Sequence, residues 1–224
     1  LEPYSFDGLP TLPTLEEMAA AHIISMRKAQ PEGPYRLGGF CNGGLTAYEM
    51  ARQLREQGQS VEALVLMDAI PPRIGAICAF IRRFGTLLRL SPEKHLDWFL
   101  RFQHAYRYLR DRKSDDFEHI KTFDARIASF FPPPETLRKD YPAMFTWATS
   151  MYKPVHYIDK VILFWDEAEP ERKSWWDRWV RGRDEKVEAH IIPGTHTTCK
   201  TEHLHGMIEH LSVCLDTIRR SVAR

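Results

Sequence analysis

The residues with the clearest chemical potential surround Cys41, in the stretch 36–44, whose sequence is RLGGFCNGG. A short apolar run ends here, and an amphipathic helical pattern follows it directly. Gly39 and Gly43 lie two residues on either side of Cys41, which matches the G-x-nucleophile-x-G spacing of a nucleophile elbow. In such an elbow a tight strand-to-helix turn holds the reactive side chain above the sheet in a strained backbone conformation. The spacing therefore predicts that Cys41 is a nucleophile, at a position where this motif usually has serine.

The place of Cys41 at the start of a predicted helix favours its thiolate form. Unpaired N–H groups and the helix dipole at a helix N-terminus lower the pKa of a thiol. The backbone N–H of Asn42 is the expected donor of an oxyanion hole. Gly39 and Gly43 are expected where a Cβ would crowd the turn or block close strand-to-helix packing, and Gly38 and Gly44 add further room. A plainer interpretation is that Cys41 is a small buried hydrophobe at a tight turn.

Two aspartates compete for the role of an acid that orients a catalytic histidine. Asp68 directly follows the apolar run 61–67, and Asp166 directly follows the apolar run 161–165. In open α/β sheets the ligand crevice lies at the carboxyl ends of the strands, so either position suits a functional carboxylate. Either could also be a turn or N-cap carboxylate. Only one of them can accept the Nδ1–H of the histidine.

His196 is the predicted base. The last apolar run, 187–192, leads into Pro193-Gly194-Thr195-His196, and Gly194 permits a sharp turn. The resulting chain order of nucleophile, acid and histidine is the order found in hydrolases with a nucleophile elbow. The chain has 10 histidines, and we interpret the others, including His190, as surface or helix residues.

The elements that must position these residues alternate between helix and strand. Apolar runs typical of buried parallel strands cover 61–67, 161–165 and 187–192, and a further short strand precedes Cys41. Helical periodicity covers residues 15–26, the segment between Gly44 and Gly58, and the segment from 201 onward, and a helix is expected to begin near Ser174. The pattern predicts an α/β fold with a mostly parallel sheet flanked by helices.

Composition excludes several classes of function. The net charge of +1 argues against nucleic-acid binding. The sequence has no run of about 18 apolar residues, so no membrane span is predicted. The four cysteines form no CxxC pair and show no zinc-ligand spacing, so no metal site is predicted. Free thiols favour a reducing, cytoplasmic setting.

A long insertion separates Asp68 from the strand at 161–165. Residues 73–113 carry ten Lys and Arg against three Asp and Glu, or about +7, which is typical of a solvated helix face or of a surface for an acidic partner. Aromatic residues recur there at roughly helical spacing, and helix-to-helix packing would account for most of them. They are Phe80, Phe84, Trp98, Phe99, Phe102, Tyr106 and Tyr108.

The chain resembles the type I thioesterase domains that end non-ribosomal peptide and polyketide synthetases. The resemblance is carried by residues 30–39, the Cys41 elbow, Tyr48-Glu49-Met50-Ala51 and Leu64-Val65-Leu66-Met67-Asp68, and it returns at His196. It implies an α/β-hydrolase fold whose catalytic residues are Cys41, Asp68 and His196, with cysteine in place of the usual serine. It also implies a core of 1–72 and 155–224 with a helical lid at 73–154, and the first strands of the family's sheet have no counterpart here.

The resemblance further implies a reaction and a partner. Such domains take an acyl or peptidyl chain from the phosphopantetheine thioester of a carrier protein and release it by hydrolysis or cyclisation. No cofactor is expected in the domain itself, because the substrate arrives on the 4′-phosphopantetheine of the carrier. A cysteine acyl-enzyme stays a thioester and keeps its activation, so we expect release by an internal nucleophile, giving a lactone or lactam.

Two other functions remain consistent with the residues. The chain could be a stand-alone cysteine hydrolase similar to dienelactone hydrolases, in which case Asp166 would be the acid. It could also be an inactive domain that binds acyl chains or partner proteins, in which case Cys41 would react no faster than Cys78 or Cys199.

Overall fold

The computed structural model describes residues 3–7, 9, 11–69, 76–112, 129–155, 160–167, 187–196 and 198–222. The chain divides into two compact units. The first, here the sheet unit, comprises Leu1–Pro3, Leu15–Pro72 and Lys153–Arg224. The second, here the helical unit, comprises Tyr4–Thr14 and Arg73–Tyr152.

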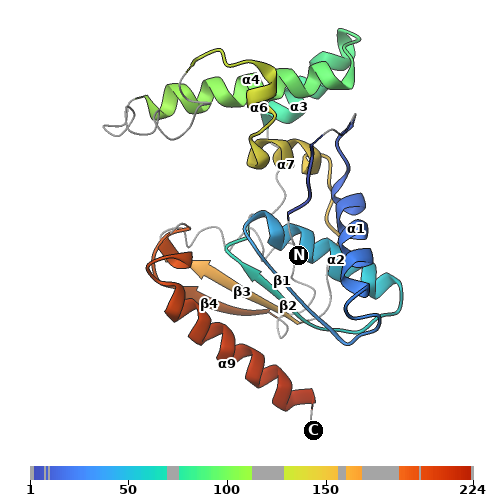
Figure 1. The fold of residues 1–224 in the computed structure, drawn as a ribbon, viewed down its shortest axis with the longest axis vertical. Helices are drawn as coiled ribbons and strands as arrows, with labels where there is room; N and C mark the ends of the chain where they lie inside the picture. Colours follow the sequence, from blue (N-terminus) through green and yellow to red (C-terminus); the bar gives the residue numbers. More distant parts are fainter. Residues whose placement is uncertain are drawn as a thin grey trace. The chain divides into compact units, whose positions relative to one another are not determined.

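The sheet unit is built on four parallel strands. They are β1 (Tyr35–Phe40), β2 (Val61–Met67), β3 (Val161–Asp166) and β4 (Val187–Ile192), in the order β1-β2-β3-β4 (Figure 1). β3 is buried along its whole length, as its unbroken apolar sequence predicts. Because all four strands run the same way, their carboxyl ends meet at one edge of the sheet. The predicted α/β class with a parallel sheet is confirmed.

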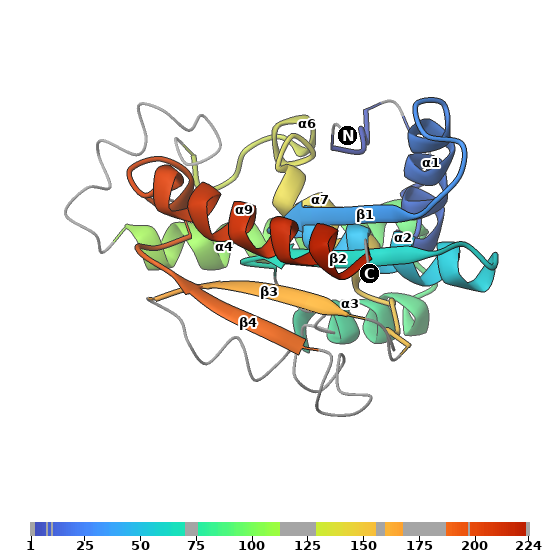
Figure 2. The same cartoon turned by 90° about the horizontal axis from the view of Figure 1, so that it is seen from below.

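Helices cover both faces of this sheet. α1 (Leu15–Arg27) and α2 (Asn42–Glu56) lie on one face and α9 (Leu204–Val222) lies on the other, as Figures 1 and 2 show. The short 3-10 helix η2 (Thr198–Lys200) precedes α9. Alternation along β2 explains the two layers, because Ala63 and Val65 point into the apolar cluster that includes Met207 and Leu211 of α9.

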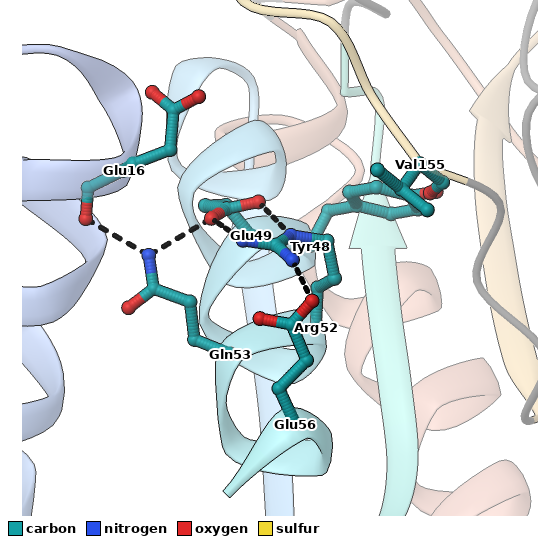
Figure 3. Close-up of polar contacts among 7 residues, drawn as sticks. All are labelled: Glu16, Tyr48, Glu49, Arg52, Gln53, Glu56 and Val155. Atoms are coloured by element: carbon teal, nitrogen blue, oxygen red, sulfur yellow. Dashed lines mark hydrogen bonds and ion pairs between the residues drawn. The ribbon is translucent and has the colours of Figure 1, made fainter.

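A polar network fixes α2, the helix that begins directly after Cys41 (Figure 3). The carboxylate of Glu49 is fully buried and accepts two hydrogen bonds from Arg52, both 2.7 Å long. Gln53 Nε2 donates to Glu49 Oε1 at 2.8 Å and to the carbonyl oxygen of Glu16 in α1 at 2.9 Å. The buried charge is thus paired and hydrogen-bonded, and the same network joins α2 to α1.

A second contact ties α2 to a distant part of the sheet unit. The hydroxyl of Tyr48 donates to the carbonyl oxygen of Val155 at 2.5 Å, as Figure 3 also shows, and the Tyr48 side chain is fully buried. Leu54 and Ala51 are fully buried on the same helix. α2 is therefore held by apolar packing and by polar contacts at once.

The helical unit contains α3 (Ala76–Leu87), α4 (Pro92–Asp111), α6 (Pro134–Leu137) and α7 (Tyr141–Thr149). Its buried cluster joins Ile81, Phe99 and Trp147, and Phe6 and Leu12 pack against it. The predicted division had assigned residues 1–72 to the core. Residues 4–14 instead cluster with the helices, because two apolar side chains of this short segment find their burial there.

Most aromatic side chains of α3 and α4 are exposed. Phe99 is buried against Trp147, with ring centroids 5.0 Å apart. Five others are between 36% and 63% exposed, so packing within the described helices does not account for them; they are Phe80, Phe84, Trp98, Phe102 and Tyr106. The expectation that helix-to-helix packing takes most of these rings is wrong for the described residues.

Two of the basic residues in the charged insertion make internal contacts. Arg107 forms an ion pair with Asp140 at 2.9 Å. Arg82 donates to the Ser150 hydroxyl at 2.8 Å, and its guanidinium lies 4.0 Å from the ring centroid of Trp147. These two charges therefore contribute to the packing of the helical unit.

Some sequence predictions fall outside the described residues. The helix expected near Ser174 and both ends of the segment 73–113 belong to this group. Within the described residues, no helix combines the length and the apolar character needed to cross a bilayer.

Candidate active site

Cys41 occupies a strained turn between β1 and α2. Its φ and ψ are 54° and −124°, a conformation that residues with a Cβ seldom adopt. Its backbone N–H donates to the carbonyl oxygen of Met67 at 3.0 Å, and its own carbonyl accepts from the N–H of Gly44 at 3.1 Å. The turn is thus fastened to the end of β2 and to the first turn of α2, which is the geometry that an elbow requires.

The glycines around Cys41 differ in what they allow. A Cβ at Gly39 would lie 2.1 Å from the carbonyl oxygen of Gly43, and a Cβ at Gly44 would lie 2.3 Å from the Cβ of Ala69. Apart from its chain neighbours and the nearby backbone of its own helix, no atom of the described residues lies within 4 Å of a Cβ built on Gly43. Close packing therefore requires glycine at positions 39 and 44, whereas the expectation of crowding at Gly43 is wrong.

Asp68 follows β2 at the same edge of the sheet. Its φ is 42°, and its backbone N–H donates to the carbonyl oxygen of Phe164 at 2.7 Å. The side chain is fully buried. A buried carboxylate is costly unless it is paired or hydrogen-bonded, and the partner here is a histidine.

His196 lies on the loop that leaves β4. Gly194, with φ of 91°, makes the turn, and a Cβ there would lie 2.5 Å from Thr198 Oγ1. The Nδ1 atom of His196 forms a short hydrogen bond with Asp68 Oδ2. The ring of Phe40 lies beside the imidazole, with centroids 4.9 Å apart. Phe40 was not among the predicted site residues, although its position directly before Cys41 in the elbow motif was a signal.

The side chains of Cys41 and His196 are hydrogen-bonded, and each changes the pKa of the other. The hydrogen bond with Asp68, followed by the one with Cys41, raises the pKa of His196 to about 9. Burial raises the pKa of Cys41, but the hydrogen bond and charge of His196 and the Asn42 backbone N–H outweigh it, so that the net pKa is lowered. Both shifts favour a thiolate facing an imidazolium.

The Asn42 backbone N–H thus points at the sulfur from the N-terminus of α2. When a carbonyl carbon becomes bonded to that sulfur, its oxygen becomes negatively charged. An N–H in this position can donate to that oxygen.

The rival acid, Asp166, lies at the last position of β3 and is almost fully buried. Ligand atoms of Asp68, Asp166 and His196 all lie within 4.8 Å of one another, so the two carboxylates share one neighbourhood. The hydrogen-bond partner of His196 Nδ1, however, is the carboxylate of Asp68.

The sequence of this site is similar to known proteins. Residues 2–214 match the family described as the thioesterase domain. The conidial pigment polyketide synthase alb1 of Aspergillus fumigatus is 37% identical over 98 residues, which are 40% of this chain and 5% of that protein. The chain therefore spans a small part of this relative.

Two solved structures are similar over most of the chain. The NocB thioesterase domain, in covalent complex with a fluorophosphonate nocardicin G analog, is 25% identical with a TM-score of 0.53, and the match covers 99% of this chain and 80% of that one. The four-domain nonribosomal peptide synthetase AB3403, bound to AMP and glycine, is 25% identical with a TM-score of 0.55, covering 92% of this chain and 16% of that one. The parallel sheet flanked by helices is thus an α/β-hydrolase fold of the thioesterase kind.

Proposed function

This chain belongs to the family of thioesterase domains, and on that premise we propose that it releases an acyl or peptidyl chain from a carrier-protein thioester through a covalent intermediate on Cys41. The observation that carries the proposal is the hydrogen-bonded series Cys41, His196 and Asp68 at one edge of the sheet. A nucleophile, a base in contact with it and an acid that orients the base are the three parts of covalent acyl transfer.

The first half-reaction transfers the acyl group to the enzyme. The Cys41 thiolate attacks the thioester carbonyl, and the Asn42 N–H donates to the oxygen that becomes negative. The tetrahedral intermediate then collapses and the pantetheine sulfur leaves, taking the proton that His196 holds. The products are a free pantetheine thiol and an acyl thioester on Cys41.

The second half-reaction releases the product. Neutral His196 takes a proton from water, or from a hydroxyl or amine of the acyl chain, and that oxygen or nitrogen attacks the Cys41 thioester. Collapse of the second intermediate returns the thiolate of Cys41 opposite the imidazolium of His196, which the pKa shifts of both groups favour. Asp68 keeps Nδ1 hydrogen-bonded throughout, so that Nε2 faces the reacting atoms.

Cysteine at the elbow has a consequence for the choice of product. Acyl transfer from pantetheine to Cys41 exchanges one thioester for another, whereas serine would give a less reactive oxygen ester. The intermediate therefore keeps its full activation for the second step. On this ground we propose release by an internal nucleophile, giving a lactone or lactam, with the chain delivered by an acyl or peptidyl carrier protein.

Two relatives support the carrier as partner. The alb1 polyketide synthase and the AB3403 nonribosomal peptide synthetase are both similar to this chain, which covers 5% and 16% of them. A stand-alone hydrolase with Asp166 as its acid receives less support, because His196 Nδ1 contacts Asp68.

The test is intact-protein mass spectrometry after mixing the chain with acyl-pantetheine thioesters, in parallel with the Cys41→Ala variant. We expect an acyl adduct on the parent chain that is missing from the variant, followed by release of a cyclic product when the acyl chain carries a terminal hydroxyl or amine. Release of the free acid alone would contradict the cyclisation proposal. Neither adduct nor turnover across several acyl chains would instead identify an inactive binding domain.

A further inference from the structure

A second group of reactive side chains lies between β4 and α9. None of its residues belongs to the candidate active site. Glu188 and His190 are two positions apart on β4 and therefore point to the same face of the strand. Cys214 of α9 meets them there. His190 Nε2 lies 2.8 Å from Glu188 Oε1 and 3.2 Å from Cys214 Sγ, and Sγ lies 3.7 Å from the same carboxylate oxygen.

One ring nitrogen of His190 thus faces two different partners. If Nε2 carries a proton, it donates to Glu188 Oε1, and the Cys214 thiol donates to the same oxygen. If Nε2 is bare, it accepts a hydrogen bond from Cys214 and its lone pair then faces the lone pairs of Glu188. A single cation between the three atoms would satisfy all of them at once.

The spacing of the three atoms is close to that of a coordination shell. Zinc bound to sulfur, nitrogen and oxygen at tetrahedral angles keeps its ligand atoms about 3.4 to 3.6 Å apart. The three separations here are 2.8, 3.2 and 3.7 Å, and the largest adjustment, for His190 Nε2 and Glu188 Oε1, is about 0.6 Å. We propose that Glu188, His190 and Cys214 form a site for a divalent transition metal, Zn²⁺ in particular, with water as the fourth ligand.

The surroundings hold these side chains in place. Lys160 Nζ pairs with Glu188 Oε2 at 3.0 Å, which leaves Oε1 directed at His190. The ring of Phe164 stacks on the imidazole of His190, with centroids 5.1 Å apart and planes 20° apart. Outer contacts of this kind orient metal ligands in known sites.

Cys214 is buried, and a further histidine lies near the group. Cys214 is 3% exposed and belongs to the apolar cluster beneath α9. His210, one turn earlier on α9, brings a second imidazole whose ring centroid is 6.4 Å from that of His190.

A metal ion at this site would restrict the loop that carries His196. Its ligands come from β4, which ends at Ile192, and from α9, which begins at Leu204. The loop with His196 lies between these two ligand-bearing elements. A metal ion would therefore close a loop of chain around His196 and limit its movement, without touching the reacting atoms. This inference does not depend on the proposed reaction.

The test is a titration of the chain with Co²⁺, a spectroscopic substitute for Zn²⁺, in the Cys41→Ala background so that the thiol of the candidate active site cannot contribute. We expect a sulfur-to-cobalt charge-transfer band and an increase in melting temperature. Adding Cys214→Ser should remove the band and weaken Co²⁺ binding by more than about 100-fold. Loss of a residue that only contacts a metal ligand typically weakens binding by about 10- to 100-fold. Adding Cys199→Ser, at a buried thiol outside the group, should leave the band unchanged.

The proposal is wrong if the band fails to appear, or if it survives Cys214→Ser and so comes from another thiol. Should Cys214→Ser fail to fold, His190→Gln and Glu188→Gln take its place, because their side chains are 27% and 36% exposed and tolerate substitution better. Each of these should weaken Co²⁺ binding, whereas His205→Gln, at an 88% exposed side chain, should not. Equal binding by all three variants would also overturn the proposal.

Discussion

The Nδ1 atom of His196 hydrogen-bonds to the carboxylate of Asp68, although 128 residues separate the two along the chain. Asp68 follows β2 and His196 lies on the loop after β4, so the contact depends on the parallel sheet that brings both strand ends to one edge. With Nδ1 bonded, Nε2 is the ring nitrogen left to exchange a proton with Cys41. The sheet, the elbow and α2 each support this geometry, and each can be tested separately.

Replacing Asp68 by asparagine should nearly abolish acyl transfer. An amide can donate to Nδ1 and so favour the wrong tautomer of His196, and the corresponding change in a serine protease costs about 10⁴-fold in kcat. The pKa of His196 should also fall, since the bond with Asp68 is the main cause of its increase. The measurements are the acylation rate of Cys41 and an NMR titration of His196. Asp166→Asn is the control, and a larger loss in that variant would make Asp166 the acid.

The reactivity of Cys41 should depend on pH in a specific way. Because the net pKa of Cys41 is lowered, its alkylation rate should reach a plateau at lower pH than that of an ordinary thiol. As pH rises through about 9, His196 loses its proton and the ion pair is lost. Burial raises the pKa of Cys78 to about 11, so that thiol should stay unreactive throughout. Iodoacetamide labelling across pH, followed by peptide mass spectrometry, measures both sites.

A matched variant tests the origin of the Cys41 shift. In His196→Gln the inflection of the labelling curve should move to higher pH, because the neutral amide removes the positive charge that lowers the pKa of Cys41. An unchanged inflection would mean that the N-terminus of α2 alone activates the thiol.

Alanine substitutions at the two elbow glycines, Gly39 and Gly43, should have different effects on stability. Gly39→Ala places a Cβ 2.1 Å from a backbone oxygen, and overpacking of this kind costs about 1 to 3 kcal/mol or more. The Cβ of Gly43→Ala meets no described atom within 4 Å beyond its own helix backbone and chain neighbours, and alanine is favoured over glycine in a helix. Urea unfolding should therefore show a large loss of stability for the first variant and none for the second. Equal losses would contradict the packing described for the turn.

Loss of the buried charge in α2 should destabilise the sheet unit. Glu49→Gln leaves Arg52 without its bidentate partner, and breaking a buried ion pair costs about 3 kcal/mol. Glu56, which pairs with the same arginine but is 64% exposed, should contribute less than about 1 kcal/mol when changed to glutamine. Denaturant unfolding of the two variants measures the difference. Similar values for both would show that burial of Glu49 has little effect.

Much of the candidate site was predictable from the sequence because it depends on strand ends. Cys41, Asp68 and His196 each follow an apolar run, and parallel strands place such residues at a common edge. The strand ends alone did not decide between Asp68 and Asp166, because both follow buried strands. The resemblance to thioesterase domains favoured Asp68, and His196 Nδ1 is hydrogen-bonded to Asp68 in the structure.

Features that depend on contacts between distant segments were not predictable. The position of residues 4–14 follows from the burial of Phe6 and Leu12 against helices far along the chain. Glu188, His190 and Cys214 have no linear zinc motif, because two come from a strand and one from a helix. The period-two spacing of Glu188 and His190 was a signal, but only the packing of α9 adds the thiol.

The pairing of β2 with β3 has a consequence for how such proteins change over evolutionary time. Residues 64–67 pair with 161–164 although the helical unit lies between them in the chain. The register is set by buried strand residues, so lengthening or shortening the inserted helices would not shift Asp68 relative to His196. Descendant sequences can therefore change the length of the insertion while they inherit one arrangement of Asp68 and His196.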